Sequence, residues 1–337
     1  MCTTLDGDIS VTSHSTRRAL LAALALACFG TLAPAHAQQT WPMRTVRIIV
    51  PFAPGGGSDV SARVLAELLA PDLGQSVIVE NRPGAGSAIG VMAAAQSKDG
   101  HTLLMGSNSM VINPLFNTSI GYDVARDFDA VGMVSAQPLV LVVPENSPAR
   151  SMQELIAQAK AQPRRITAGN SGNGTLAHLT SQILEEQAGI ELITVPYKGE
   201  SALMPDLISG LVAMGFLNLP SVAPHIKSGR LRALAVSSPQ PITSLPGVPT
   251  LRSLNYPSLE VQGWAALVAP KGSIPDAGLA RLEALLAKAL ASEQVKSRFA
   301  ALNVAPVSEN RTQTARFLAA ESQKYAAIIK SRGITRD

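Results

Sequence analysis

The sequence is poor in cysteine and in charged side chains. Its two cysteines, Cys2 and Cys28, stand near the start of the 337-residue chain. The remainder can therefore form no disulfide framework, thiolate metal site or cysteine nucleophile. Charged residues make up 15% of the chain, and the net charge of +4 is spread without the basic stripe that nucleic-acid binding requires. This distribution disfavours a polyanionic partner and leaves small anions as candidate ligands.

The composition that remains is typical of a folded protein. Hydrophobic residues make up 46% of the chain, which is enough for a packed core and excludes a disordered protein. The length suggests about two domains. After the first 40 residues, no stretch approaches 18 uninterrupted apolar residues, so the sequence predicts no permanent membrane span there.

The first 37 residues have the pattern of a secretory signal peptide. Arg17 and Arg18 precede the apolar run 19–29, and the small-residue motif Ala35-His36-Ala37 follows. Cleavage after Ala37 would place residues 38–337 outside the cytoplasm. The paired arginines leave both the general secretory and the twin-arginine route open, and Cys28 leaves lipidation open.

The residues that follow predict alternating strands and helices, as in parallel α/β proteins. The expected strands of a first series are residues 46–50, 77–79, 102–105 and 139–143. The last of these is apolar at every position between Pro138 and Pro144, which predicts a strand covered on both faces. Ser58 or Asp59 is expected to cap the first helix and Gly74 to end it.

A second series follows, and then the pattern changes. Ser151 and Glu154 form a capping-box signal before a helix, and a further helix is expected from Thr175. The expected strands of this series are residues 165–168, 192–195, 213–217 and 231–236. Residues 277–291 and 312–329 have long helical patterns, and no strand is expected between them.

Two glycine-rich turns carry the chemistry that the residues themselves indicate. Residues 54–59 and 171–175 each join a predicted strand to a helix. A helix N-terminus offers unpaired N–H groups and a partial positive charge, and glycine lets a ligand approach the backbone closely. If the turns belong to different lobes, both can face one cleft and hold a carboxylate. The alternatives also remain, namely turns that are merely conformational and an Asp59 that only caps its helix.

Motifs for catalysis or cofactor binding are incomplete. Residues 84–90 resemble a loose dinucleotide fingerprint but lack a fitting acidic residue, which favours a packing turn. Asn173 replaces the final glycine of a nucleophile elbow. His101, His178 and His225 lie in separate segments without metal-ligand spacing. We therefore expect no catalytic residue, no metal and no cofactor.

Many ordered segments resemble one family, the extracytoplasmic receptors of tripartite tricarboxylate transporters, known as Bug receptors. The resemblance begins with Pro51-Phe52-Ala53-Pro54-Gly55-Gly56-Gly57-Ser58-Asp59 and Val79-Glu80-Asn81-Arg82-Pro83-Gly84-Ala85-Gly86. It continues through Asp99-Gly100-His101-Thr102, Val195-Pro196-Tyr197-Lys198-Gly199 and Leu245-Pro246-Gly247-Val248-Pro249-Thr250. It extends over essentially all of residues 38–337.

The resemblance implies an α/β, two-lobed periplasmic binding protein fold of type II with two crossing strands. Each lobe would be a mostly parallel sheet flanked by helices. Residues 1–37 would be the signal peptide, residues 38–142 with 262–337 the first lobe, and residues 143–261 the second. The mature protein would be a periplasmic monomer.

The resemblance also implies a small-carboxylate ligand, such as a di- or tricarboxylate, an amino acid or an aromatic acid, held between the lobes. The expected contacts from the first lobe are Phe52, Ala53, Pro54, Gly55, Gly56, Asp59, Ser107 and Asn108. Those from the second lobe are Ser171, Gly172, Thr175, His178, Tyr197, Gly199 and Ser201.

The implied partners are the large and small membrane permease subunits of the transporter, with no nucleic acid. Two alternatives stay open at this point. One is a secreted α/β hydrolase that uses Ser171 and His178. The other is a receptor of the same fold that feeds a membrane sensor kinase.

Overall fold

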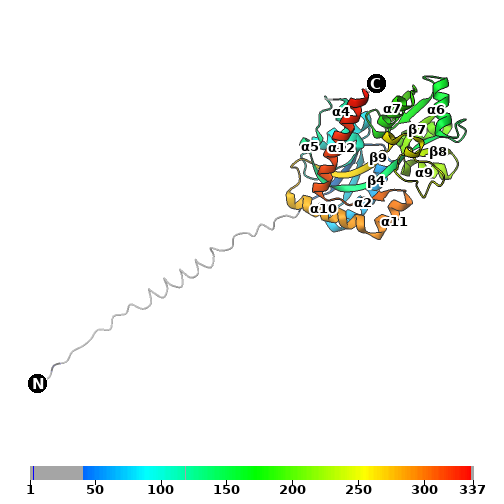
Figure 1. Cartoon of the computed structure of the whole chain (residues 1–337). Helices are drawn as coiled ribbons and strands as arrows, with labels where there is room; N and C mark the ends of the chain where they lie inside the picture. Colours follow the sequence, from blue (N-terminus) through cyan, green and yellow to red (C-terminus); the bar gives the residue numbers. More distant parts are fainter. Residues whose placement is uncertain (1–2, 4–40, 118, 335–337) are drawn as a thin grey trace. The chain divides into compact units, whose positions relative to one another are not determined.

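The computed structural model describes Thr3, residues 41–117 and residues 119–334. The predicted signal peptide, with both cysteines, lies outside the described residues apart from Thr3. Trp41–Asp337 form one compact unit, in which helices cover a central set of strands (Figure 1). Within the described part of the chain, no helix is long and apolar enough to span a bilayer.

The strands and helices alternate through most of this unit. The strands are β1 (Val46–Val50), β2 (Val77–Asn81), β3 (Thr102–Ser107), β4 (Phe128–Pro144), β5 (Thr167–Asn170), β6 (Ile193–Pro196), β7 (Met214–Asn218), β8 (Leu231–Val236), β9 (Gln262–Pro270) and β10 (Ala305–Pro306). The α-helices are α2 (Gly57–Leu73), α3 (Ala88–Ala95), α4 (Asn108–Phe116), α5 (Val124–Asp127), α6 (Met152–Ala161), α7 (Leu176–Ala188), α8 (Glu200–Ser209), α9 (Leu219–Lys227), α10 (Asp276–Ala291), α11 (Glu293–Ala301) and α12 (Arg311–Arg332). Short 3-10 helices are η1 (Ala85–Ser87), η2 (Arg252–Leu254) and η3 (Pro257–Leu259).

Strand β4 belongs to two sheets. Its first part pairs antiparallel with β9, from Phe128 opposite Pro270 to Pro138 opposite Gln262. Its second part, from Leu139, pairs antiparallel with β7 and β8. The chain therefore passes from one sheet to the other between Pro138 and Leu139. The predicted lobe boundaries at residues 142/143 and 261/262 stay a prediction.

Both sheets are mixed rather than mostly parallel. The first has the order β2-β1-β3-β9-β4, in which β1 pairs parallel with β2 and β3, while β9 is antiparallel to its neighbours. The second continues β4-β7-β5-β6, in which β5 pairs parallel with β6 and β7. Each parallel group comes from a strand–helix series, and β4 and β9 add the antiparallel pairs.

The strand predicted to be covered on both faces is covered. Residues 139–143 of β4 are all buried, and successive side chains enter different cores. Leu139, Leu141 and Val143 belong to a core shared with α4, α7 and α12, whereas Val140 and Val142 pack with α8 and α9. A third core packs α2, α10 and α11 against the first sheet. Figure 1 shows these three helices on the side of β4 and β9 away from α4 and α12.

Several sequence expectations about elements were wrong. Strand β9 and residues 128–138 of β4 were missed, and Pro138 does not bound the strand. The missing N–H of Pro138 falls where the ladder with β9 ends, so the proline is tolerated there. Helix α11 and the short β10 lie between the two C-terminal helices, where no strand was expected. The side chain of Ser151 caps α6 as predicted, but the Glu154 carboxylate accepts the N–H of Arg150 rather than that of Ser151.

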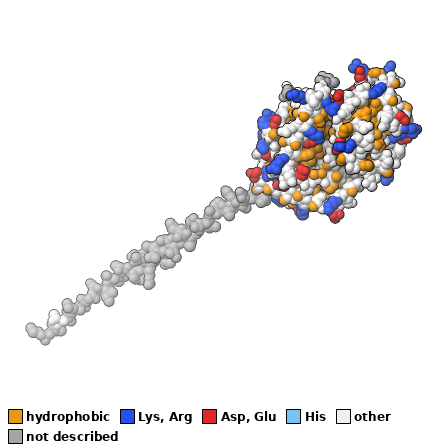
Figure 2. Space-filling view, in the orientation of Figure 1, with side chains coloured by type: hydrophobic (Ala, Val, Ile, Leu, Met, Phe, Trp, Pro, Cys, Tyr) orange, Lys and Arg blue, Asp and Glu red, His pale blue; other side chains and the backbone are white. Residues whose placement is uncertain are grey.

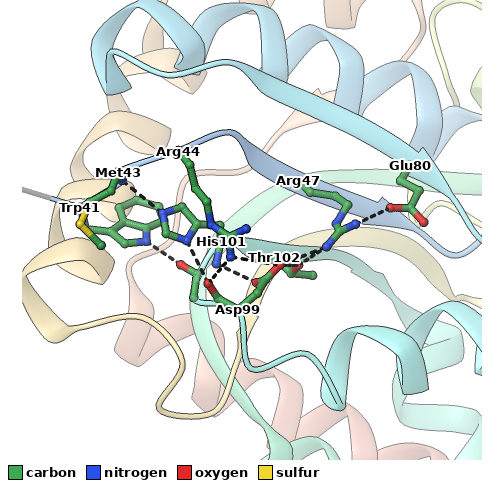
Figure 3. A network of polar contacts seen from close by, with 9 residues as sticks. Trp41, Met43, Arg44, Arg47, Glu80, Asp99, His101 and Thr102 are labelled. Atoms are coloured by element: carbon green, nitrogen blue, oxygen red, sulfur yellow. Dashed lines mark hydrogen bonds and ion pairs between the residues drawn. The ribbon is translucent and has the colours of Figure 1, made fainter.

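The start of the described unit is tied to the turn before β3 (Figure 3). The indole N–H of Trp41 donates to the carbonyl of Gly100 at 2.6 Å, and Nε2 of His101 accepts the N–H of Met43 at 3.2 Å. The Asp99 carboxylate accepts from the His101 N–H and from Arg47. His101, one of the histidines of the sequence, thus has a structural role beside β1.

Candidate functional site

The first glycine turn follows β1 and leads directly into α2. Gly56 is the N-cap of α2, and no side chain caps this helix, so the predicted Ser58 or Asp59 cap is wrong. The Asp59 carboxylate points back into the turn, where it accepts the N–H of Gly55 at 2.9 Å. Gly55 has φ +84°, a conformation that favours glycine. Asp59 therefore stabilises the shape of the turn.

Asp59 is buried in a network of donors. Arg63 pairs with both of its oxygens at 3.0 Å, and the Asn81 amide donates to Asp59 at 2.9 Å and to the Phe52 carbonyl at 3.1 Å. Burial alone would raise the pKa of Asp59, but the hydrogen bonds from Arg63, Gly55 and Asn81 lower it below its ordinary value. The residue is thus an ionised support behind the turn.

The second glycine turn follows β5 and leads into α7. Asn170 Oδ1 accepts the N–H of Gly172 at 2.8 Å, and Thr175 caps α7 by accepting the N–H of His178. Gly172 and Gly174 have φ +126° and +84°. Nδ1 of His178 accepts the N–H of Gly174, so this buried histidine supports the turn from within.

A third turn follows β6, the strand that pairs with β5. Tyr197 donates its hydroxyl to Asp206 at 2.6 Å, and burial together with this bond raises the pKa of Tyr197 to about 12. Gly199, with φ +124°, is the residue before α8. The geometry therefore places the Tyr197 hydroxyl on α8, while the backbone of the turn continues to Gly199 and Glu200.

The turns of the two sides touch through their backbones. The N–H of Ala53 donates to the carbonyl of Lys198 at 3.3 Å. A Cβ added to Gly172 would lie 2.8 Å from the Cα of Gly86, and one added to Gly86 would lie 2.0 Å from the Asn173 carbonyl oxygen. Residues 84–86 are thus a packing turn, as the sequence favoured, and glycine is required for this close approach.

Two small cavities of about 40 Å³ each lie where the turns meet. Phe52, Ser58, Ser171, Glu200 and Asn218 line both of them. The first residues of α2, α4, α7 and α8, namely Gly57, Asn108, Leu176 and Glu200, also line one or both. Among the described lining residues there is no Lys, Arg or His, and Glu200 has the one ionisable side chain.

The cavities bring together about half of the predicted contact residues. Those that line them are Phe52, Ala53, Gly56, Ser107, Asn108, Ser171 and Thr175. Those in neither lining are Pro54, Gly55, Asp59, Gly172, His178, Tyr197, Gly199 and Ser201. Most of the second group shape the turns just described. Whether any of these residues contacts a ligand stays a prediction.

Other lining residues were missed by the sequence reasoning. Ser58 stands inside the quoted turn 54–59, and Glu200 directly follows the quoted segment that ends at Gly199, so their positions were a usable signal. Gln137, Gly263 and Trp264 come from the crossing part of β4 and β9, which local patterns did not indicate. Asn218 is the last residue of β7, and no glycine-rich turn next to it marked it as a site residue. Ser107 Oγ and Asn218 Oδ1 are buried without a hydrogen-bond partner.

Asn108 holds the first side of the cavities in place. Its side-chain N–H group donates to the Gln262 carbonyl and to the Tyr325 hydroxyl, each at 3.0 Å, and its Oδ1 accepts the N–H of Trp264 at 3.0 Å. The start of α4 is thereby joined to β9 and α12. Both polar atoms of the Asn108 side chain form hydrogen bonds, which hold this side chain in one orientation in the cavity wall.

The surface agrees with the scattered charge of the sequence. Figure 2 shows Lys and Arg side chains interspersed with Asp and Glu on the face in view, without a basic stripe. An open groove of about 820 Å³ lies elsewhere, between α4, α5 and α12, and no predicted contact residue lines it. Within the described residues, no cluster of His, Cys, Asp and Glu could hold a metal ion.

Comparisons with known proteins agree with this architecture. Residues 61–334 match the family model described as tripartite tricarboxylate transporter family receptor. Protein BugT of Bordetella pertussis is 40% identical over 323 residues, which are 95% of this chain and 98% of BugT. The solved structure of periplasmic binding protein BugD aligns with a TM-score of 0.84 at 30% identity, covering 88% of this chain and 100% of BugD. R. palustris Rpa4515 with adipate aligns with a TM-score of 0.83 at 31% identity, covering 88% and 99%.

Proposed function

The chain belongs to the family of tripartite tricarboxylate transporter receptors, and from this premise we propose that it captures a small carboxylate between its lobes for delivery to such a transporter. The two-lobed periplasmic binding protein fold is confirmed, and the family consists of solute-binding proteins rather than enzymes. The hydrolase alternative built on Ser171 and His178 is therefore not retained. In this proposal residues 1–37 are the signal peptide, and the mature receptor meets a large and a small permease subunit at the membrane.

The observation that carries the proposal is the convergence of helix N-termini on the cavities. Helices α2, α4, α7 and α8 all begin at a lining residue. The first N–H groups of a helix have no intrahelical partner, and the helix dipole adds a partial positive charge. Four such ends can stabilise an anion without a Lys or Arg side chain. The adipate bound by Rpa4515, a dicarboxylate, supports a carboxylate as that anion.

Closure of the lobes would link ligand binding to recognition of the loaded receptor by its membrane partner. A carboxylate that contacts α2 on one side and α8 on the other gains both sets of hydrogen bonds only when the turns approach each other. Its binding therefore shifts the population toward the closed arrangement. The direct Ala53 to Lys198 hydrogen bond shows how close the turns come. A membrane sensor kinase that recognises the same closed arrangement is the alternative partner. Transport assays in a strain lacking the permease genes separate transport from signalling.

A thermal-shift screen tests the proposal. Mono-, di- and tricarboxylates are compared with neutral sugars at equal concentration, and at least one carboxylate class should raise the melting temperature. At a ligand concentration of 100 Kd the gain is about 2.7 kcal/mol. The variant Ser171→Ala, which alters both cavities, should reduce the shift, while Ser331→Ala on the exposed end of α12 should not. Stabilisation by sugars but by no carboxylate would refute the proposal.

A further inference from the structure

Glu200 is an unusual group to find in a site for an anion. It is the first residue of α8, is 8% exposed and lines both cavities. One carboxylate oxygen, Oε1, accepts the backbone N–H of Asn218 at 2.9 Å and its side-chain N–H at 2.8 Å. The other, Oε2, accepts the hydroxyl of Ser221. Three donors from the start of α9 thus hold the carboxylate in one orientation.

No cation of the described residues balances this carboxylate. Among the described residues, no charged neighbour acts on Glu200, and the cavity walls contain no Lys, Arg or His. Burial raises the pKa of Glu200 even though the bonds from Asn218 and Ser221 act in the opposite direction. A buried acidic group without a counter-charge is costly, and a positively charged group brought by a ligand would relieve that cost.

A second acceptor stands beside the carboxylate. Asn218 Oδ1 is buried without a hydrogen-bond partner, and Asn218 lines both cavities together with Glu200. The opposite wall has a different character, because there the start of α2 and the hydroxyl of Ser58 provide donors. The site therefore has a donor wall for an anion and an acceptor pair for a group that carries N–H bonds.

Resting on the proposed function, we propose that Glu200 selects a carboxylate that also carries an ammonium group, so that the ligand is an amino acid rather than a plain di- or tricarboxylate. The ligand carboxylate lies against the start of α2, and its ammonium group donates to Glu200 and to Asn218 Oδ1. A dianion without nitrogen would instead add negative charge next to an acidic group.

The probes form three sets, and the three members of each set differ in a single substituent. They are alanine, lactate and propionate; aspartate, malate and succinate; and glutamate, 2-hydroxyglutarate and glutarate. Within each set the carbon chain is the same, and one position carries an ammonium group, a hydroxyl or hydrogen. Calorimetry on the wild-type protein should give at least one set in which the ammonium member binds about tenfold or more tightly than both others, because hydrogen bonds between charged groups are the stronger ones.

The variant Glu200→Gln keeps the shape and removes the charge, and it should reduce this preference to less than about threefold. Glu185→Gln is the matched control. Glu185 is a partly buried acidic residue of α7 whose pKa is also raised by burial, but it accepts the N–H of Leu192 and lines neither cavity. It should leave the preference unchanged. Circular dichroism and the melting temperature without ligand check that both variants fold.

The outcomes separate this inference from the proposed function. If hydroxy or unsubstituted acids bind as tightly as the amino acids, or if the preference persists in folded Glu200→Gln, the carboxylate site stands and the role of Glu200 is refuted. If no member of any set and no other carboxylate binds, both fail. If Glu200→Gln does not fold, the wild-type comparison within each set still decides the ligand class.

Discussion

Replacing Gly86 by alanine should weaken ligand binding without unfolding the protein. Gly86 lies in the packing turn after β2, and the added Cβ would lie 2.0 Å from the carbonyl oxygen of Asn173 on the opposite side. Real Cβ contacts essentially never fall below 3.0 Å, so the two turns must separate by about 1 Å. Neither Gly86 nor Asn173 belongs to any of the three hydrophobic cores, so the core packing should survive a local separation of the two turns.

The magnitude follows from the cost of the closed arrangement. Overpacking typically costs about 1–3 kcal/mol, and here the obstacle is backbone, which cannot rotate away as a side chain can. If the closed state loses about 3 kcal/mol relative to the open one, the apparent affinity falls about 100-fold. Alanine at φ +62° adds backbone strain of about 1–2 kcal/mol, which lowers stability but leaves closure unaffected.

The control is Gly74→Ala, which separates the two effects. Gly74 has φ +69°, nearly the same strain, but a Cβ there would meet nothing within 4 Å. Both variants should show a similar drop in melting temperature, and calorimetry with the best ligand of the screen should show the large loss of affinity only for Gly86→Ala. Equal affinities of the two folded variants would refute the reasoning that closure through this contact governs binding.

Two further predictions concern stability. The pKa of Asp59 is lowered in the folded protein, so the stability that Asp59 contributes is present above the unfolded pKa of about 3.9 and is lost as the pH falls through the folded pKa. Between pH 7 and pH 3 the free energy of unfolding, measured with urea, should therefore fall more in the wild type than in Asp59→Asn. Equal losses in the two proteins would contradict this. Leu141→Ala removes most of a fully buried side chain from the part of β4 that is covered on both faces, and it should lower the free energy of unfolding by about 2–5 kcal/mol, as measured with urea. A loss below about 1 kcal/mol would contradict a central place of this strand in the core.

Local patterns predicted most elements of the two strand–helix series. Residues 46–50 and 231–236 match β1 and β8, and Gly74 ends α2 as expected. These segments could be found because their periodicity and their glycine or proline ends are encoded within a few neighbouring residues. The same signals failed for β9 and for the first part of β4, whose partners lie far away in the sequence. Pro138 misled the prediction because a change of sheet, rather than a strand end, accommodates it.

The candidate site divides along the same line. The sequence by itself determined the two glycine turns, the helices that start from them and the absence of cysteine beyond the first 28 residues. Only the tertiary structure decided that Glu200 and Asn218 line both cavities together with Ser58, and that Gln137 and Trp264 line one of them. The reason is that β4 and β9 connect distant parts of the chain, and the pairing of these strands, rather than any local pattern, determines which side chains converge between the turns.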